Sequence, residues 1–142
     1  MPEALRQATG LLRVRTPGRA LVEITRDVRD WVDAQGMADG LLTLFCRHTS
    51  ASLVIQENAA PAVKQDLIDW LDRVAPEDHA YAHDDEGPDD MPAHIKAMLT
   101  GVSLTVPLIG GALALGTWQG VYLIEHRHRA HDRQIALHLL GN

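Results

Sequence analysis

The spacing of apolar residues along the chain predicts seven or eight short strands and three helices. Short alternating or continuous apolar runs bounded by turns are typical of strands, whereas apolar residues three and four apart are typical of one helix face. Strands are expected at residues 11–15, 20–25, 41–46, 52–57, 103–109, 112–118, 120–125 and 133–140. Helices are expected at residues 26–36, 61–74 and 91–100. Short turns join most strands, which favours an α+β fold of two antiparallel sheets packed face to face in a sandwich-like way, with the helices on one side.

Capping and turn residues define the ends of several elements. Thr25 is placed to cap the first helix and Gly36 to end it. Asp90 is placed to cap the third helix, and Gly101 to end it. The pair Gly110–Gly111 lies between two strands and predicts a hairpin. We find no linker or repeat, so residues 1–142 are expected to form a single domain.

The run LLTLFC at residues 41–46 is continuously apolar. It therefore predicts a central strand that is buried on both faces. Cys46 ends this run, where a buried thiol that acts as a small hydrophobic group is favoured over a nucleophile. Pro107 cannot donate a backbone hydrogen bond, so its strand is expected at a sheet edge or to be irregular there.

Composition excludes several classes of function. The chain has 142 residues and a net charge of -6, which argues against a general nucleic-acid-binding protein. No apolar run reaches the ~18 residues of a membrane span. The opening MPEALRQATG has no apolar core, so no secretory signal is expected, and a lone cysteine agrees with a reducing cytoplasm. A cytoplasmic protein that binds neither nucleic acid nor membrane is the expectation.

Histidines and carboxylates gather in segments that could meet at strand ends. The loop and helix start HDDEGPDDMPAHIK supplies His83, Asp90 and His94, while His48 and Glu125 follow or end apolar strands. Mixed imidazole and carboxylate sets suit zinc, manganese or iron. A solvated acidic turn and exposed histidines are the alternative, and for each residue alone that alternative is favoured. The metal site requires that the fold brings these segments together.

Basic residues indicate a second type of chemistry, the binding of phosphate. Helix N-terminal amides and the side chains of arginine and lysine hold anions. The segment HRHRAHD could be such an anion-binding loop or a solvated turn. No Walker loop, GxGxxG, CxxC or GxSxG motif is present, which removes the common nucleotide, zinc-finger and hydrolase assignments. The candidate anion ligands are the helix start at Met91, Lys96, Arg47, Arg127 and Arg129.

Four segments together resemble one known family. HTSASLVIQEN at residues 48–58 resembles an HTSASL…NEN segment, and residues 83–96 resemble HDYEGxDDMPxHIK. SLTVPLIGGALALGTWQGV at residues 103–121 resembles a long signature ending in GTWQ, and Glu125-His126-Arg127 follows. The chain is similar throughout to the YjbQ family, the secondary thiamine-phosphate synthase enzymes. The resemblance implies a small α+β domain of two packed antiparallel sheets and a homotrimer.

The resemblance also implies an activity, weak thiamine-phosphate synthesis. A hydroxymethylpyrimidine diphosphate is joined to a thiazole phosphate, and pyrophosphate is released. Two departures occur: Gln56 stands where Asn is common, and Asp84-Asp85 replaces an Asp-Tyr pair. A phosphorylated metabolite is then the expected partner, and zinc or magnesium the possible divalent cofactor. The alternatives are a non-catalytic metal- or metabolite-binding trimer and a metal-dependent hydrolase.

The site residues follow from the matched motifs. Metal ligands are expected at His48, His83 and His94, and catalytic roles at Glu125, His94 and His48. Trp118 could stack on a substrate ring, or pack in the core or between subunits. The substrate-binding residues are expected to be Arg47, Thr49, Asn58, Asp90, Trp118, Gln119, His126 and Arg127.

Overall fold

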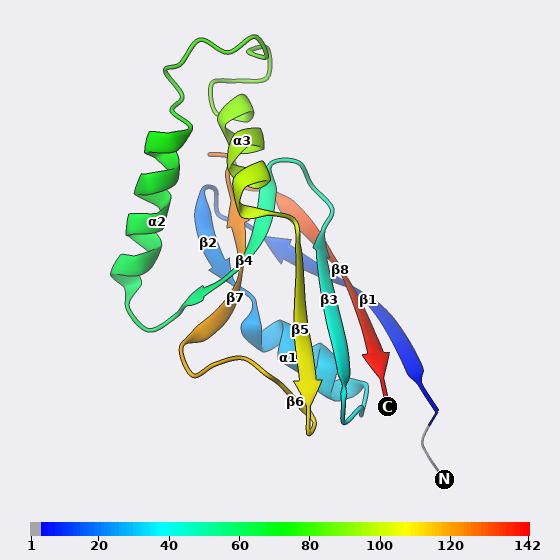
Figure 1. The fold of residues 1–142 in the computed structure, drawn as a ribbon. Helices are drawn as coiled ribbons and strands as arrows, with labels where there is room; N and C mark the ends of the chain where they lie inside the picture. The colour runs from blue at the N-terminus through cyan, green and yellow to red at the C-terminus, as the bar shows by residue number, and fades with distance from the viewer. Residues whose placement is uncertain (1–3) are drawn as a thin grey trace.

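Over residues 4–142, eight strands pair into two antiparallel sheets, and three helices pack against them (Figure 1). The structure is a computed structural model that describes residues 4–142, so the first three residues considered for a secretory signal lie outside it. The larger sheet has the order β1 (Arg6–Arg15), β8 (Asp132–Gly141), β3 (Gly40–Cys46), β5 (Ser103–Ile109) and β6 (Ala112–Leu113). The smaller has the order β2 (Ala20–Glu23), β7 (Gln119–Glu125) and β4 (Ala51–Glu57). The helices are α1 (Thr25–Ala34), α2 (Pro61–Val74) and α3 (Asp90–Thr100).

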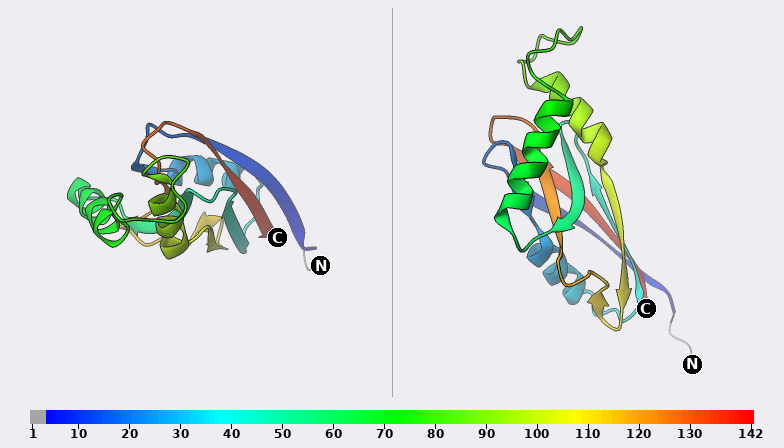
Figure 2. Two further views of the ribbon diagram at one scale, coloured as in Figure 1. Left: turned by 90° about the horizontal axis from the view of Figure 1, so that it is seen from above. Right: turned by 60° about the vertical axis from the view of Figure 1, so that its left-hand side comes forward.

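The predicted α+β class with two packed antiparallel sheets is confirmed. The larger sheet is strongly curved, and α1 lies inside its concave side (Figure 2). Val28 and Val32 of α1 join the main core between the sheets, as their helical spacing predicts. Leu42, Leu44 and Leu53 meet them there from the strands.

The prediction that β3 is buried on both faces is wrong. Leu41 and Phe45 lie on the outer face of the larger sheet and are 45% and 47% exposed. The strand buried on both faces is β7, in the middle of the smaller sheet. Its Leu123 belongs to the core between the sheets, and its Tyr122 to a second cluster under α2. Both β3 and β7 contain a continuous apolar run. Such a run alone therefore does not distinguish a strand that is buried on both faces from a strand with an exposed apolar face.

The prediction that the helices lie on one side of the sheets is wrong. Helix α1 contacts β1, β6 and β7 on the core side, whereas α2 contacts β2 and α3 contacts β4 (Figures 1 and 2). Leu67 and Ile68 of α2 cover Tyr122 on the outer face of the smaller sheet. That sheet is therefore covered on both faces. Among residues 4–142, no helix combines the length and the apolar character needed to cross a membrane.

Both predicted helix caps are wrong, because each residue has another role. The N-cap of α1 is Ile24, and Thr25 follows it in the first turn. The Thr25 hydroxyl accepts a hydrogen bond from the Val121 amide at 2.9 Å. The N-cap of α3 is Asp89, whose side chain makes no capping hydrogen bond, and Asp90 is the first residue of the helix. The Asp90 carboxylate is instead directed into a cluster of side chains described below.

The predicted helix stops and the hairpin are confirmed. Gly36 and Gly101 have φ of +65° and +92°, a region that glycine adopts without steric cost. Gly110–Gly111 forms the hairpin turn, with φ of +59° and +83°. The strand expected at residues 112–118 is shorter, since β6 ends at Leu113. Pro107 lies on the part of β5 that β6 does not reach, as expected of an edge residue.

Gly10 on β1 allows α1 to pack closely on the larger sheet. A Cβ atom at this position would lie 2.4 Å from Nε1 of Trp31. We expect Gly10→Ala to lower the free energy of unfolding by about 1–3 kcal/mol, since the indole has to move out of its packed position. Urea unfolding measures the change, with exposed Thr9→Ala as the control. Equal stability of the two variants would mean that Trp31 does not hold α1 on the sheet.

Candidate metal centre

Two histidines and one aspartate converge where the acidic loop enters α3. Nε2 of His83 lies 2.7 Å from Oδ2 of Asp90, and Nε2 of His94 lies 3.1 Å from the same oxygen. The ligand atoms of the three residues all lie within 4.8 Å of one another. Asp90 is buried, whereas the two imidazoles reach the surface. The structure thus brings together three of the residues that the sequence singled out.

The hydrogen bond on the far side of His94 defines its tautomer. Nδ1 of His94 lies 2.9 Å from the carbonyl oxygen of Thr49, which can only accept a hydrogen bond. Nδ1 therefore carries a proton, and Nε2 of His94 faces Asp90. Two acceptors then face each other unless a proton or a cation lies between them. A histidine held through its other nitrogen by a backbone carbonyl is typical of a metal ligand.

Arg127 holds the other oxygen of Asp90. Its Nη1 donates to Oδ1 of Asp90 at 2.5 Å, and its Nε donates to Oδ2 of Asp89 at 3.0 Å. Its Nη2 donates to the carbonyl oxygen of Glu86 at 2.9 Å. One guanidinium thus ties the acidic loop to the end of β7. The loop is therefore only partly a solvated turn, because Asp89 and Asp90 are buried and paired.

Charges in the cluster shift its pKa values in opposite directions. Burial would raise the pKa of Asp90, but the hydrogen bond from His83 and the charges of His94 and Arg127 outweigh it and lower the pKa. The hydrogen bond to Asp90, helped by Asp85 and Glu86, raises the pKa of His83. Asp90 is therefore ionised at neutral pH and available as an anionic ligand.

A basic cavity adjoins the cluster on the side of Arg127. It has a volume of about 440 Å³, and the segment after β7 contributes Arg127, His128, Arg129 and His131 to its lining. Glu86, Gly87 and Asp89 line the rest. His128 also pairs with Glu77. The segment HRHRAHD therefore places two arginines and two histidines in a cavity beside the His83, Asp90 and His94 cluster, opposite Glu86 and Asp89.

His48 lies close by, but the structure places it outside the cluster. Its Nε2 accepts the backbone amide of Gln134 at 2.8 Å, which occupies that nitrogen. Among the described residues, the cluster with Asp90 consists of His83 and His94 without His48. Burial, followed by the charge of Arg133, lowers the pKa of His48, so the ring is neutral. The structure therefore does not bring the three predicted histidines together; the cluster it forms consists of His83, His94 and Asp90.

A groove of about 770 Å³ runs from His94 past His48. Arg47 and Thr49 line its polar end, and Phe45 and Met98 are among its apolar walls. Arg47 is exposed and donates to Oε1 of Gln134 at 3.1 Å. Of the predicted substrate-binding residues, Arg47 and Thr49 thus lie together beside the cluster.

Glu125 is not placed to act as a general base or a metal ligand. It is fully buried and accepts two hydrogen bonds from Arg133, at 2.7 Å and 2.5 Å. Thr16 and the backbone amide of Arg127 complete its partners, at 2.7 Å and 3.1 Å. Burial opposes ionisation, but these donors together lower the pKa of Glu125. Its role is to hold the ends of β7 and β8 together as a buried ion pair.

His126 is also buried, which corrects its predicted contact with substrate. Thr100 donates to the carbonyl of Lys96 at 2.8 Å, so it accepts from Ser52, whose hydroxyl lies 2.5 Å away. Ser52 in turn accepts from Nε2 of His126 at 2.8 Å. The chain of donors fixes His126 as the Nε2–H tautomer. Burial, followed by the charge of Lys96, lowers the pKa of His126 to about 3.

This buried histidine makes the stability of the fold depend on pH. Below a pH of about 6.5 the unfolded chain protonates His126, whereas the folded chain does so only near its pKa of about 3. The free energy of unfolding is therefore complete above pH 6.5 and is lost as the pH falls, by about 1.4 kcal/mol for each pH unit. His48 acts in the same direction, and His83, with its raised pKa, in the opposite direction.

Urea unfolding between pH 6.5 and pH 5 measures this dependence. In that range few carboxylates titrate, so the slope reports mainly histidines. We expect His126→Asn to reduce the slope by about one proton relative to the wild type. A slope that is the same in both proteins would show that His126 does not stay neutral in the folded state.

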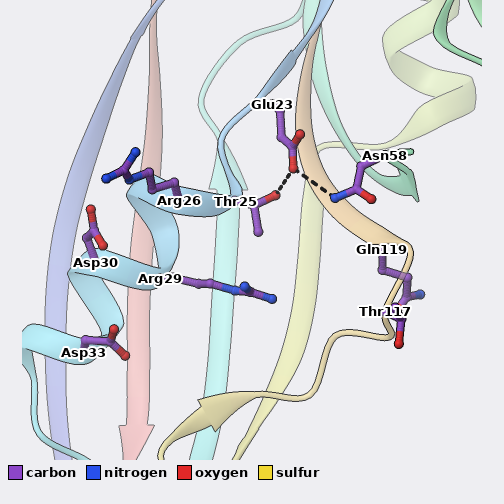
Figure 3. A pocket seen from close by; sticks show the side chains of 9 residues that line it. All are labelled: Glu23, Thr25, Arg26, Arg29, Asp30, Asp33, Asn58, Thr117 and Gln119. Atoms are coloured by element: carbon purple, nitrogen blue, oxygen red, sulfur yellow. Dashed lines mark hydrogen bonds between the residues drawn. The ribbon is translucent and has the colours of Figure 1, made fainter. Parts of the chain in front are cut away.

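The remaining predicted residues lie at the other end of the smaller sheet. In the register of β4 and β7, Glu57 faces Gln119 while Ala51 faces Glu125, so the two ends are six residues apart, about 20 Å. Asn58 and Gln119 line a separate pocket at that end (Figure 3). Trp118 beside it is 63% exposed, so it is not a core residue. The predicted substrate-binding residues Asn58, Trp118 and Gln119 therefore lie apart from the histidine–aspartate cluster.

Several residues that contact the predicted site residues were not predicted from the sequence. Arg133 and Thr16 give no motif signal, since only the fold places them around Glu125. Lys96 was a candidate for anion binding, but it is buried and pairs with Asp72 at 2.8 Å. The signal for Asp89 was available, because it adjoins Asp90 in the acidic loop.

The fold and cluster together define a class of protein: small α+β proteins with two antiparallel sheets and a histidine–aspartate cluster at one sheet end. A family model described as "UPF0047 protein YjbQ-like" matches residues 11–142. The chain belongs to this family, which confirms the resemblance seen in the sequence. The family has no established function, and its model therefore assigns no activity.

Relatives and solved structures agree with this assignment. A UPF0047 protein of Synechocystis sp. is 47% identical over 137 residues, covering 96% of this chain and 93% of its own length. The UPF0047 protein YjbQ of Salmonella typhimurium is 49% identical over 102 residues, covering 72% and 74%. A crystal structure of an uncharacterized YjbQ/UPF0047 protein from Clostridium acetobutylicum has a TM-score of 0.80 at 36% identity, covering 92% and 97%. A YbjQ-like protein of unknown function from Sulfolobus solfataricus shares the fold, with a TM-score of 0.85 at 23% identity, covering 96% and 100%.

Proposed function

We propose that the protein is a metal-dependent enzyme that acts on a phosphorylated small molecule, with thiamine-phosphate formation as its candidate reaction. One observation carries the proposal. Asp90 faces His83 and His94 with one oxygen and Arg127 with the other. A cation site and an anion site would then share one buried carboxylate. Such a pair suits a substrate whose phosphate is bound by a metal and by an arginine.

The donor set favours zinc over magnesium. Two imidazole nitrogens and a carboxylate oxygen suit zinc, manganese or iron, whereas magnesium prefers an all-oxygen shell. The carbonyl of Thr49 and the guanidinium of Arg127 already orient His94 and Asp90. A bound divalent ion would neutralise phosphate oxygens and so make a diphosphate a better leaving group.

The residues around the cluster fit the candidate reaction. In thiamine-phosphate formation the C–O bond to the diphosphate breaks, and the diphosphate keeps the electron pair. The thiazole nitrogen forms the new C–N bond with its own lone pair and has no proton to lose. No general base is needed, in agreement with the buried ion pair of Glu125. Arg127 and Arg129 in the basic cavity would bind the phosphates, and the groove beside His94 would hold a ring against Phe45.

An assay with both thiamine precursors tests the proposal. Metal-free protein is reloaded with zinc, manganese or magnesium and supplied with hydroxymethylpyrimidine diphosphate and thiazole phosphate. We expect thiamine phosphate only from metal-loaded protein, and its loss in Asp90→Asn but not in Asp84→Asn. A folded, zinc-loaded protein that forms no product and releases no phosphate or pyrophosphate would contradict an enzymatic function and leave a non-catalytic metal- or metabolite-binding protein.

A metal-dependent hydrolase is the second candidate, for one specific reason. Three protein ligands leave a coordination position for water, as in catalytic zinc sites, and His83 is 39% exposed, so water reaches the cluster. The same assay separates the two. Pyrophosphate or phosphate released from the pyrimidine diphosphate without the thiazole would favour the hydrolase.

We further propose that the protein assembles as a homotrimer through the outer face of the larger sheet. Leu11 and Phe45 flank Ala136 on this face, and Leu41 pairs with Leu140 in the next apolar row. Each of the four large side chains is more than two-fifths exposed, and the row of Thr43 and His138 lies between the two apolar rows. Exposed apolar side chains gathered on one face are of the kind that marks subunit contacts.

Light scattering after gel filtration tests the assembly. We expect about three chain masses for the wild type and one for Phe45→Lys, because a charge in an apolar contact is costly to bury. Gln65→Lys on α2 is the matched control and should keep the wild-type mass. A wild type that elutes as a monomer would contradict the homotrimer.

A further inference from the structure

A second pocket lies at the end of the smaller sheet opposite the histidine–aspartate cluster. It has a volume of about 590 Å³, within the range of small-molecule sites. Helix α1 forms one wall, and the ends of β2, β4 and β7 form the other (Figure 3). No residue of the His83, Asp90 and His94 cluster lines it. The proposed enzymatic function leaves this pocket without a role.

Glu23 is held in a fixed position at the strand wall. Its Oε2 accepts hydrogen bonds from Oγ1 of Thr25 at 2.8 Å and from Nδ2 of Asn58 at 3.3 Å. Gly120 makes room for this arrangement, since a Cβ there would lie 2.7 Å from Oε2 of Glu23 and 3.1 Å from Cβ of Asn58. Both donors use Oε2, while Oε1 accepts none of the hydrogen bonds of residues 4–142; the buried hydroxyl of Tyr122 lies near the same carboxylate.

Arg29 supplies the opposite charge from the helix wall. Its side chain extends from α1 across the pocket toward Thr117 and Gln119 (Figure 3). Over residues 4–142, no carboxylate lies within 4.0 Å of its guanidinium, although five arginine–carboxylate pairs form elsewhere. An arginine that lines a pocket without a protein anion is available for a carboxylate or a phosphate.

Neutral polar groups lie on the same side of the pocket as the end of Arg29. Oε1 of Gln119 accepts the backbone amide of Gly116 at 2.8 Å, which fixes the side chain and leaves its NH₂ group as a donor. Thr117 adds a hydroxyl. The Arg29 side therefore has a cation and neutral donors, whereas the Glu23 side has acceptors, the carboxylate of Glu23 and the amide oxygen of Asn58.

The charges of the pocket determine what it can hold. Three carboxylates (Glu23, Asp30 and Asp33) and two arginines (Arg26 and Arg29) line it, so the lining has a net charge of one negative unit. A simple anion would meet this excess of carboxylates, and a simple cation would meet Arg29. We propose that the pocket binds a small amino-carboxylate zwitterion, with its carboxylate on Arg29 and its ammonium group on Glu23.

A homologous series of ligands tests the proposal and measures the spacing. The probes are unbranched ω-amino acids from glycine to 6-aminohexanoate, titrated into the full chain labelled with ¹⁵N. Signals from the side-chain amides of Asn58 and Gln119 and from the indole of Trp118 report binding next to the pocket. We expect saturable shifts below about 10 mM for one or two neighbouring chain lengths, since only these span both charges.

Variants assign the two charges. Arg29→Ala and Glu23→Gln are each expected to weaken the best probe by about tenfold or more, since each removes one charge-assisted contact. Arg26→Ala is the matched control, because Arg26 is a cation of the same helix that points away from Glu23 and Asn58 (Figure 3). No saturable shift with any probe would overturn the proposal. Binding that survives Arg29→Ala, or falls equally in Arg26→Ala, would overturn it as well.

Discussion

Replacing Asp90 by asparagine is expected to lower the affinity for zinc by about 100-fold or more, since groups that only orient a metal ligand are already worth 10–100-fold. The carboxylate contributes the one negative charge that faces both His83 and His94. The amide has nearly the same shape but a weaker donor oxygen, and it loses the ion pair with Arg127. The cluster would keep two neutral imidazoles, which hold zinc weakly on their own.

Competition with a chromophoric chelator at pH 7.5 measures this affinity. Asp84→Asn is the matched control, because Asp84 belongs to the same loop and is exposed. We expect the control to bind zinc as the wild type does. Equal affinity in Asp90→Asn and in the wild type would place the zinc elsewhere on the protein.

Replacing Arg133 by methionine is expected to lower the free energy of unfolding by about 3–5 kcal/mol, the usual cost of leaving a buried charge unpaired. Glu125 is fully buried, and Arg133 holds both of its oxygens. After the substitution only Thr16 and the Arg127 amide remain as donors. The carboxylate would then take up a proton more easily, so its lowered pKa should rise.

Urea unfolding of a double-mutant cycle measures this effect. Glu125→Gln combined with Arg133→Met removes both charges, and we expect it to be more stable than Arg133→Met alone. Arg13→Met is the matched control, since Arg13 is an exposed residue of β1 that faces Gln134. If Arg133→Met unfolds at the same urea concentration as Arg13→Met, the buried pair does not stabilise the end of the sheets.

Local signals were enough to predict most elements. Helix α2 begins at Pro61 and ends at Val74, as its apolar spacing indicates. The hairpin at Gly110–Gly111 follows from the need for positive φ at both residues. The two helix caps could not be predicted, because Thr25 and Asp90 make tertiary contacts that no local pattern reveals.

The candidate site was predicted only in part. His83, Asp90 and His94 lie within twelve residues, so the acidic loop and one helical turn bring them together. Glu125 and His126 follow each other in sequence, but their side chains point to opposite faces of the sheet, one to Arg133 and one to Ser52. Which of these two faces is exposed to solvent depends on tertiary packing, and no local pattern in the sequence reveals it.

The separation of Asn58 and Gln119 from the cluster follows from strand pairing. Strands β4 and β7 are antiparallel, so the residues before β4 and those after β7 meet at one end. Thr49 and Arg127 therefore lie near the cluster, while Asn58 and Gln119 lie at the other end. The family resemblance assigns the residues of all these motifs to one set of site residues, whereas the pairing of the strands places them at two ends of the smaller sheet.

Anomalous diffraction at the zinc absorption edge, from crystals grown with zinc and pyrophosphate, tests the central claim most directly. We expect one strong peak bonded to Nε2 of His83, Nε2 of His94 and a carboxylate oxygen of Asp90, with pyrophosphate between this peak and Arg127. A zinc peak away from these three residues, or pyrophosphate bound only at a distance from Arg127, would contradict a shared metal and phosphate site.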